Sequence, residues 1–360
     1  MRFALLGNHS DGLAIARALV ATGRHDLVAV QDSSAPEFAL GAAIVADLEE
    51  ILADPAIALV IVAGAESIRA EQLRRALQSE RHVLCVHPFA KKPELAYQAA
   101  VIQAETKVLL LPLMPDSLHP AFTRLTELAK KKMQLLRLDR RGIESLCWDM
   151  LRRVGGEIVE LVGFASAEEW TQAEPLLLNG KFEKGGLFQV TVLPGVEQRQ
   201  ELSLLGAEIE AELTGPASDG GAQLCWRMKN GDWQEEAWNT WDRWAAMATL
   251  VDDALENPTN EIRISWQDEV RYLELDDALL RSVEKRRASS LDLAEFTEDS
   301  GPKGTLTLIG CGMIWLLLLI FALSIWLPWI RWAIVPLLVG FLALLALKWL
   351  GSSRPTAPTK

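Results

Sequence analysis

The sequence predicts an α/β protein in three consecutive parts: a parallel sheet covered by helices, a domain built on an antiparallel sheet, and a C-terminal transmembrane helical hairpin. Three observations support this prediction. Continuous apolar runs alternate with amphipathic segments over residues 1–115. Strand-like segments separated by short turns follow them. Near the C-terminus, an uncharged apolar stretch is long enough to cross a bilayer.

The first domain, residues 1–115, is predicted from the order of its elements. Five continuous apolar runs, separated by segments with helical spacing of apolar residues, are expected to be strands: 3–6, 27–30, 58–63, 83–86 and 108–111. Continuous apolar strands are typical of a parallel sheet that helices cover on both faces. We therefore expect a Rossmann-type parallel sheet.

The second domain, residues 116–287, starts with a helix predicted over residues 120–132. Six strands are expected next, most of them joined by short turns: 135–140, 157–165, 186–192, 201–205, 208–213 and 223–228. Short connections favour antiparallel pairing. Two helical stripes, in residues 241–255 and 266–287, complete an α+β domain.

The C-terminal hairpin is the strongest physical signal. Residues 305–327 carry no charge, and as a helix they would span roughly 34 Å, against about 30 Å for the hydrocarbon core. A second transmembrane helix is predicted over residues 329–350, although Pro336 lies within it, so a re-entrant segment is the alternative. The polar residues 288–304 are expected to be a tether, and residues 351–360 a cytoplasmic tail.

The distribution of charge predicts the orientation of the hairpin. Lysines and arginines flank it on both sides, whereas the turn between its two apolar runs, 305–327 and 332–347, holds only Arg331. Positive charge on both flanks predicts that both ends lie in the cytoplasm. Because Met1 leads directly into an apolar strand, no secretory signal is expected. We expect a multi-pass protein of the inner (cytoplasmic) membrane, with the lipid bilayer as a partner and its soluble body facing the cytoplasm.

The composition argues against nucleic acid as a partner. Residues 305–360 hold four of the 36 basic side chains and none of the 48 acidic ones, which leaves residues 1–304 with a net charge of −16. Such an acidic body should be repelled by nucleic acid. The four cysteines have neither metal-ligand nor disulfide spacing, and no metal site is expected.

A loop with two glycines follows the first predicted strand. A dinucleotide fingerprint needs glycines for a tight turn, for close approach of the pyrophosphate and for strand–helix packing. Gly7 and Gly12 supply the outer two positions, with Asn8 between Gly7 and the middle position. His9 occupies that middle position, where its Cβ narrows the room for the diphosphate. The helix N-terminus that follows still offers amide donors to an anion.

Two further residues complete the candidate cofactor-binding site. Asp32 ends the second strand, 20 residues after Gly12, where a carboxylate would accept hydrogen bonds from the ribose diol. Ala63 ends the third strand of the same sheet. The expected cofactor is NAD or NADP. The alternative is a Rossmann-type domain that is retained only for its shape.

Several segments occur in an order and spacing that extends over most of the chain: residues 47–55, 58–63, 74–88, 119–121, 149–152, 155–160, 280–283, 303–304 and 310–312. This pattern resembles the Gfo/Idh/MocA oxidoreductase family. The resemblance implies an NAD(P)-dependent enzyme acting on a sugar-like alcohol, with a Rossmann domain followed by a domain with an open, mostly antiparallel sheet. It also implies a homo-oligomer formed through that sheet.

The sequence departs from the family pattern at three positions that the resemblance would assign to the cleft. The family's Glu-Lys-Pro triplet reads Val86-His87-Pro88 here, so the lysine is replaced by His87. The family's histidine and aspartate on the following helix correspond to Leu146 and Asp149. A further family histidine, after the third strand, corresponds to Arg69.

These departures leave two functional interpretations open. In one, the protein is an active oxidoreductase in which His87 takes the hydroxyl proton, oriented by Asp149, since a histidine can do this near neutral pH. In the other, His87 is only a solvent-facing residue at a strand end. The chain is then an oxidoreductase-like sensor or scaffold with impaired or lost catalysis. The middle glycine, the lysine and the histidine are all replaced, by His9, His87 and Leu146, and three replacements in one presumed cleft favour the second interpretation.

Overall fold

The computed structural model describes residues 1–31, 42–130, 133–142, 146, 148–166, 174–195, 199–215, 220–257 and 263–285, and the backbone of 289–290. Asp32, most of the predicted tether, the hairpin and the tail lie outside these residues. Within the described part of the chain, no helix has the length and apolar composition needed to cross a bilayer.

The N-terminal sheet is parallel throughout and has six strands in the order β3-β2-β1-β4-β5-β6. Its strands are β1 (Arg2–Leu6), β2 (Asp26–Gln31), β3 (Ala43–Ile44), β4 (Ile57–Val62), β5 (His82–Val86) and β6 (Leu110–Leu113). The predicted Rossmann-type sheet is thus confirmed. The short β3 was not predicted, and β6 starts two residues later than expected.

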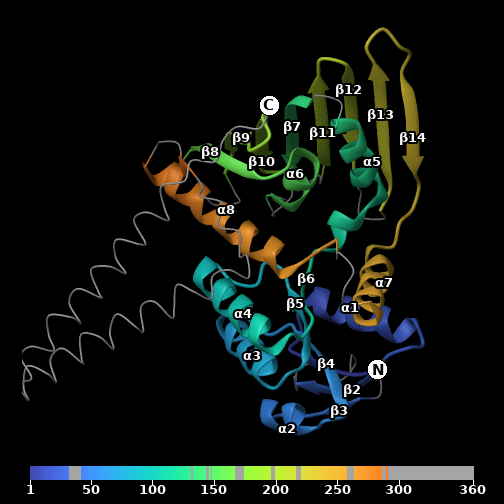
Figure 1. Ribbon diagram of the computed structural model, residues 1–360, viewed down its shortest axis with the longest axis vertical. Helices are drawn as coiled ribbons and strands as arrows, with labels where there is room; N and C mark the ends of the chain where they lie inside the picture. Colours follow the sequence, from blue (N-terminus) through green and yellow to red (C-terminus); the bar gives the residue numbers. More distant parts are fainter. Residues whose placement is uncertain are drawn as a thin grey trace, which may run out of the picture. The chain divides into compact units, whose positions relative to one another are not determined.

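Four helices connect these strands: α1 (Ser10–Ala21), α2 (Leu48–Ala53), α3 (Glu66–Gln78) and α4 (Pro93–Thr106). In Figure 1, α3 and α4 lie on one side of the sheet and α1 on the other. This double cover explains the continuous apolar strands, because β4 and β5 are buried from both sides.

The second sheet has nine strands in the order β14-β13-β12-β11-β7-β10-β9-β8-β15. The strands are β7 (Met133–Arg141), β8 (Ile158–Ala165), β9 (Leu176–Phe182), β10 (Leu187–Leu193), β11 (Arg199–Gly206), β12 (Ile209–Thr214), β13 (Ala222–Met228), β14 (Gln234–Trp238) and β15 (Ser289–Ser290). All neighbouring pairs are antiparallel except β7 and β10, which are parallel. The mostly antiparallel sheet is therefore confirmed.

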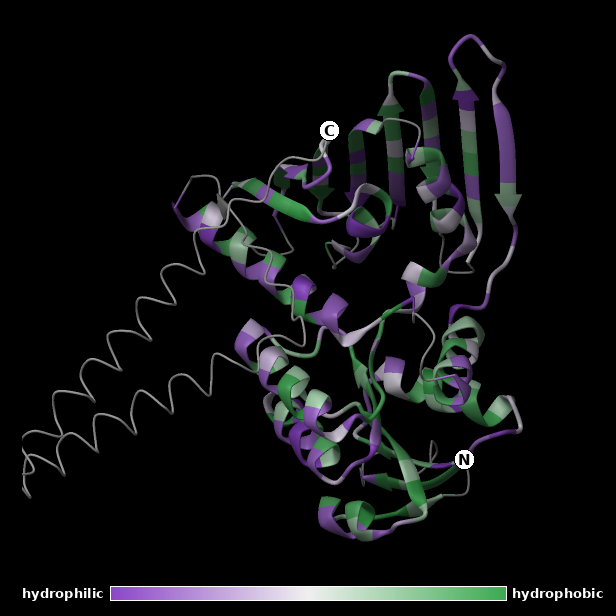
Figure 2. Ribbon diagram, in the orientation of Figure 1, coloured by the Kyte–Doolittle hydropathy of each residue, from purple (hydrophilic) through white to green (hydrophobic). Residues whose placement is uncertain are grey.

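The strands of the second sheet alternate buried and exposed residues, as along β10, and Figure 2 shows this as stripes of apolar and polar colour. Such alternation is typical of a sheet with one covered face. The sequence did not predict β9 or β14. It also assigned residues 289–290 to the tether, whereas their backbone pairs with β8.

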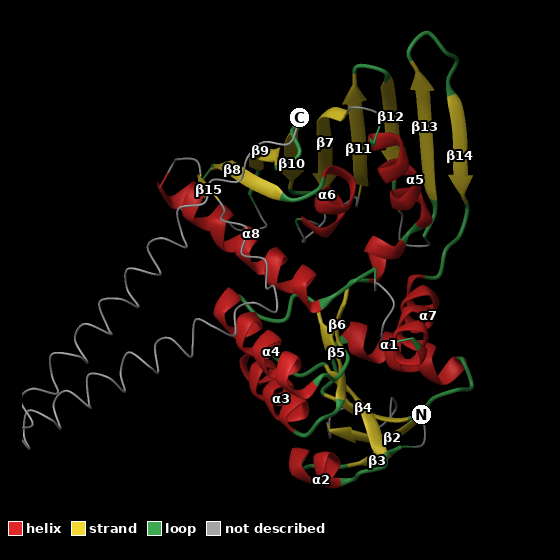
Figure 3. Ribbon diagram, in the orientation of Figure 1, coloured by secondary structure: helices red, strands yellow, loops and turns green. Residues whose placement is uncertain are grey.

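The second domain contains these helices: the 3-10 helix η2 (Pro115–Leu118), α5 (Pro120–Ala129), α6 (Trp148–Gly155), α7 (Arg243–Glu256) and α8 (Trp266–Lys285). Figure 3 shows α5 and α6 in front of the strands of the second sheet, and α8 contacts β8 at the other end of that sheet. The helices α7 and α8 return to the first domain, where α7 packs against α1 and α8 against α4. Through this return, the start of α8 comes to lie at the carboxyl end of β5.

Candidate functional site

A buried histidine–glutamate pair lies where β5 ends. His87 follows the last residue of β5, and its Nδ1 is 2.5 Å from Oε2 of Glu269 in α8. The other carboxylate oxygen, Oε1, accepts a hydrogen bond of 2.6 Å from the backbone N–H of Phe89. The Glu269 side chain is fully buried, and that of His87 is 14% exposed. One carboxylate therefore positions both the imidazole and the loop that carries it.

The start of α8 explains how Glu269 reaches this place. The Asp268 carboxylate accepts a hydrogen bond of 2.8 Å from the Ser265 N–H, so the N-terminal end of α8 is capped. Trp266 Nε1 donates to the Ala96 carbonyl in α4 at 2.9 Å, which fixes α8 against the first domain. Carboxylates in a first helical turn are also favoured by the helix dipole.

Several acidic groups act on His87. Burial lowers the pKa of His87, but the Glu269 carboxylate, with Asp149 and Asp276, raises it above its usual value of 6.5. Burial raises the pKa of Asp276 to about 6, although Trp148 Nε1 donates to its Oδ1 at 2.5 Å. The Tyr272 ring lies edge-on to His87, with ring centroids 4.2 Å apart. The imidazole is thus held in one orientation, with protonation favoured.

The structure corrects the predicted partner of His87. The hydrogen-bonded carboxylate is Glu269, whereas Asp149 contributes through its charge, which raises the pKa of His87. Burial raises the pKa of Asp149, and His87 and Arg153 lower it in part. The interpretation of His87 as a solvent-facing residue is wrong, because the side chain is largely buried. A sign of Glu269 in the sequence was its place within the apolar stripe of α8.

The other two replaced positions have structural roles. Leu146 is buried at 4% exposure. Arg69 is also buried, and its guanidinium donates to the Gly64 carbonyl at 3.1 Å and to the Pro88 carbonyl at 2.7 Å. Arg69 therefore joins the loop after β4 to the loop after β5. Across the described residues there is no group of three or more histidine, cysteine or acidic side chains suited to a metal ion.

The loop between β1 and α1 has the shape that a dinucleotide fingerprint requires. Gly7 has φ +99°, and a Cβ there would lie 2.4 Å from the Ala63 carbonyl oxygen. A Cβ at Gly12 would lie 2.3 Å from the Ala63 Cβ. Both glycines are thus needed for the tight turn and for packing of α1 on β4, and Ala63 is the residue they pack against. The outer positions fit a bound dinucleotide.

The middle position of the loop is modified. His9 is the N-cap of α1, and its Nδ1 accepts a hydrogen bond of 3.3 Å from the Asp11 N–H. One amide at the helix N-terminus is thereby bound by the protein itself. Asn8 lies in the same loop, between Gly7 and His9. The fourth predicted contact, Asp32, lies outside the described residues.

Gly7→Ala tests the loop geometry. We expect the substitution to lower the free energy of unfolding by about 3 kcal/mol, because it adds a clash with the Ala63 carbonyl to an unfavourable φ. Gly23→Ala is the matched control: Gly23 has φ +70° but nothing within 4 Å of its added Cβ. It should cost only about 1 kcal/mol. Equal costs in urea unfolding would contradict the close approach of Gly7 to Ala63.

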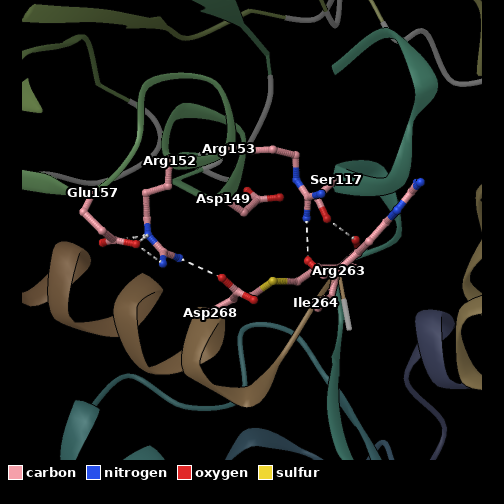
Figure 4. A pocket seen from close by; sticks show the side chains of 9 residues that line it. Ser117, Asp149, Arg152, Arg153, Glu157, Arg263, Ile264 and Asp268 are labelled. Atoms are coloured by element: carbon pink, nitrogen blue, oxygen red, sulfur yellow. Dashed lines mark hydrogen bonds and ion pairs between the residues drawn. The ribbon is translucent and has the colours of Figure 1, made fainter. Parts of the chain in front are cut away.

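Asp149 also lines a cavity of about 280 Å³. Its walls come from the segment after β6, from α6 and from the start of α8, and they carry charges of both signs. Figure 4 shows Asp149, Arg153 and Ser117 close to one another, whereas the side chain of Arg263 extends away from them. The cavity and the His87–Glu269 pair therefore share Asp149 as a neighbour.

Comparison with known proteins now adds to this geometry. Residues 1–113 match the Gfo/Idh/MocA family model, described as an oxidoreductase family with an NAD-binding Rossmann fold. No curated protein matches the chain.

Solved structures resemble the chain over both domains. GenD2 from gentamicin A biosynthesis, in complex with NAD, has a TM-score of 0.66 at 20% identity. The match covers 81% of this chain and 96% of the GenD2 chain. Levoglucosan dehydrogenase, in complex with NADH and levoglucosan, has a TM-score of 0.68 at 15% identity. The match covers 81% of this chain and 99% of the dehydrogenase chain. A putative myo-inositol dehydrogenase from Sinorhizobium meliloti has a TM-score of 0.65 at 18% identity, covering 81% and 100%.

These likenesses show the fold that the two domains share with the solved structures. The family resemblance and the NAD-binding type of the first domain are confirmed by the family match. Over residues 1–113, this chain is thus similar to the NAD-binding Rossmann domains of the Gfo/Idh/MocA oxidoreductase family.

Proposed function

We propose that the protein is a membrane-anchored NAD(P)-dependent oxidoreductase of a sugar- or polyol-like alcohol, with His87 as the proton acceptor. One observation carries this proposal: the buried His87–Glu269 pair at the carboxyl end of β5. In open α/β sheets, ligands bind at the carboxyl ends of the strands. A histidine held by a buried carboxylate is a suitable arrangement for a general base.

The roles of this chain's own groups follow from that geometry. NAD supplies the hydride acceptor when it is bound. Since Nδ1 of His87 is bound to Glu269, the hydroxyl proton passes to Nε2 as the O–H bond breaks. His87 must be neutral to accept it. Because its pKa is raised, oxidation should accelerate as the pH rises through a value above 6.5, and the protonated form suits carbonyl reduction.

The relatives support the substrate class. Levoglucosan dehydrogenase carries levoglucosan together with NADH, and GenD2 carries NAD. Both share the present fold at low identity, so levoglucosan suggests a class of alcohol rather than a particular substrate, and GenD2 supports the cofactor. The membrane anchor is proposed from residues 305–327 and 329–350, whose apolar length is its support.

A non-catalytic role is the second candidate, and the His9 cap is the observation that favours it. In the fingerprint loop a Cβ stands at the middle position, and the Asp11 amide is already bound by the His9 side chain. At the start of α1, one backbone N–H fewer would therefore be available to donate a hydrogen bond to a pyrophosphate. In that case the Rossmann domain would serve a sensor or scaffold at the membrane.

Calorimetric titration of NADH and NADPH into the detergent-solubilised chain separates the two candidates. We expect a dissociation constant on the order of micromolar, weakened about tenfold or more by Asp32→Ala. His87→Gln should then lower kcat for alcohol oxidation by about 10²- to 10⁴-fold and leave the dissociation constant of the cofactor unchanged. If neither cofactor binds at millimolar concentration, the oxidoreductase proposal fails and the scaffold role is supported.

A further inference from the structure

The cavity beside Asp149 contains an uneven pairing of charges. It is lined by the arginines Arg152, Arg153 and Arg263 and by the carboxylates Asp149, Glu157 and Asp268. Arg152 lies within ion-pair distance of two carboxylates: Nη2 is 2.5 Å from Glu157, and Nη1 is 3.1 Å from Asp268. Glu157 also accepts a hydrogen bond of 3.2 Å from Arg271. These groups satisfy one another and leave little capacity for a ligand.

Arg153 differs from its neighbour. The hydrogen bond of its guanidinium is to a neutral acceptor, the Arg263 carbonyl, at 3.0 Å. Among the described residues it has no carboxylate within ion-pair distance. Burial lowers the pKa of Arg153, and the charges of Arg263 and Arg152 lower it further. The charges of Asp149 and Asp268 raise this pKa, but the net shift is downward. The pKa of Arg152, by contrast, is raised, because its carboxylate partners outweigh its burial.

Arg263 supplies a second cation of the same kind. Arg263 is exposed and lines the cavity, and within the part of the chain that the structure describes its guanidinium forms no ion pair. Two guanidinium groups therefore line one cavity, and the charge of Arg263 lowers the pKa of Arg153 because like charges repel. A bound anion would remove this repulsion and could accept parallel hydrogen bonds from either group, since arginine binds carboxylate and phosphate in a bidentate manner.

We propose that this cavity binds an anionic monosaccharide, whose carboxylate or phosphate pairs with Arg153 and Arg263. Its volume of about 280 Å³ lies just below the range of about 300–1,000 Å³ that is usual for drug-sized ligands. A single sugar ring suits this volume, whereas the nucleotide of a nucleotide sugar would have to lie outside. Asp149, on the wall of the cavity, would place the ring of such a sugar toward His87.

The identification of the anionic sugar as the substrate rests on the proposed function, whereas the binding of the anion does not. The test therefore measures binding without cofactor. Probes are compared in matched pairs with the detergent-solubilised full chain: D-gluconate with D-sorbitol, D-glucuronate with D-glucose, and D-glucose 6-phosphate with D-glucose. Each pair differs in the anionic group, and the phosphate pair separates the two anion chemistries.

We expect at least one anionic probe to bind about tenfold or more tightly than its neutral counterpart. Arg153→Gln and Arg263→Gln should each remove most of that preference. Because Arg263 is exposed, Arg263→Gln remains informative even if Arg153→Gln does not fold. Arg227→Gln is the control: Arg227 forms an exposed pair with Glu210 on the second sheet, and its replacement should not change binding.

Three outcomes would overturn the inference: no binding of any anionic probe at 10 mM (about the limit of a weak site), equal binding of neutral and anionic sugars, or a preference that persists in both arginine variants. The result also stands apart from the proposed function. A chain that binds NADH but no anionic sugar overturns this inference alone. A chain that binds the sugar through Arg153 and Arg263 but no cofactor overturns the oxidoreductase proposal and keeps the binding site.

Discussion

Replacing Glu269 by alanine is expected to lower the free energy of unfolding by about 3 kcal/mol, because breaking a buried charge pair leaves the partner without compensation. The carboxylate is fully buried and binds both His87 and the Phe89 N–H. Its removal leaves a buried imidazole and a buried amide without their acceptor. Urea unfolding at pH 6 would measure the loss.

Two variants keep this prediction specific. Glu269→Gln retains an acceptor for the Phe89 N–H but loses the charge, so it should cost less, about 1 kcal/mol. Glu284→Ala removes an exposed glutamate from the same helix and should change stability by less than about 0.5 kcal/mol. If Glu269→Ala were as mild as Glu284→Ala, the buried pair would not contribute to stability as its geometry indicates.

The same pair makes a prediction about pH. Because the folded-state pKa of His87 is raised above 6.5, its interaction with Glu269 stabilises the fold fully below the unfolded pKa. That contribution is lost as the pH rises through the folded pKa. In Glu269→Gln, burial opposes protonation without the nearest charge, so the pKa of His87 should fall. NMR titration of the His87 imidazole would show this decrease; an unchanged pKa would assign the shift to Asp149 and Asp276.

Removal of the apolar C-terminal segment is expected to have the largest effect on where the protein is found. The full chain should sediment with membranes, resist extraction by high salt and be released by detergent, because residues 305–350 contain two long apolar stretches. Residues 1–292, which form one compact unit, should stay in the supernatant. Comparing the two by fractionation and immunoblotting tests the proposed anchor.

A shorter deletion is the matched control. Without residues 351–360 the hairpin is intact, so that chain should still sediment with membranes. External protease applied to spheroplasts should leave the body uncut if it faces the cytoplasm, as the flanking positive charge predicts. Membrane association of residues 1–292 alone would show that the body itself binds lipid. Release of the full chain by high salt would contradict an integral anchor.

Features that depend on local pattern could be predicted from the amino-acid sequence. Continuous apolar runs such as residues 83–86 predicted strands buried on both faces, and β5 (His82–Val86) lies there. The glycines of the first loop were recognisable for the same reason: the conformation of a turn depends on the few residues in it, and Gly7 has the positive φ that the tight turn requires. The family resemblance rested on the order of such local segments.

Contacts between residues that are distant in the chain could not be predicted from local pattern. Glu269 lies 182 residues after His87 in the chain, and no periodicity predicts that pairing, since it depends on how α8 packs against the first domain. The hydrogen bond from the Arg153 guanidinium to the Arg263 carbonyl, 110 residues further along the chain, likewise depends on packing between distant segments. Strands β9 and β14 were missed because long-range pairing stabilises them more than their own apolar pattern does. Local patterns thus predict elements, whereas packing of the two domains against each other brings together the residues of the site.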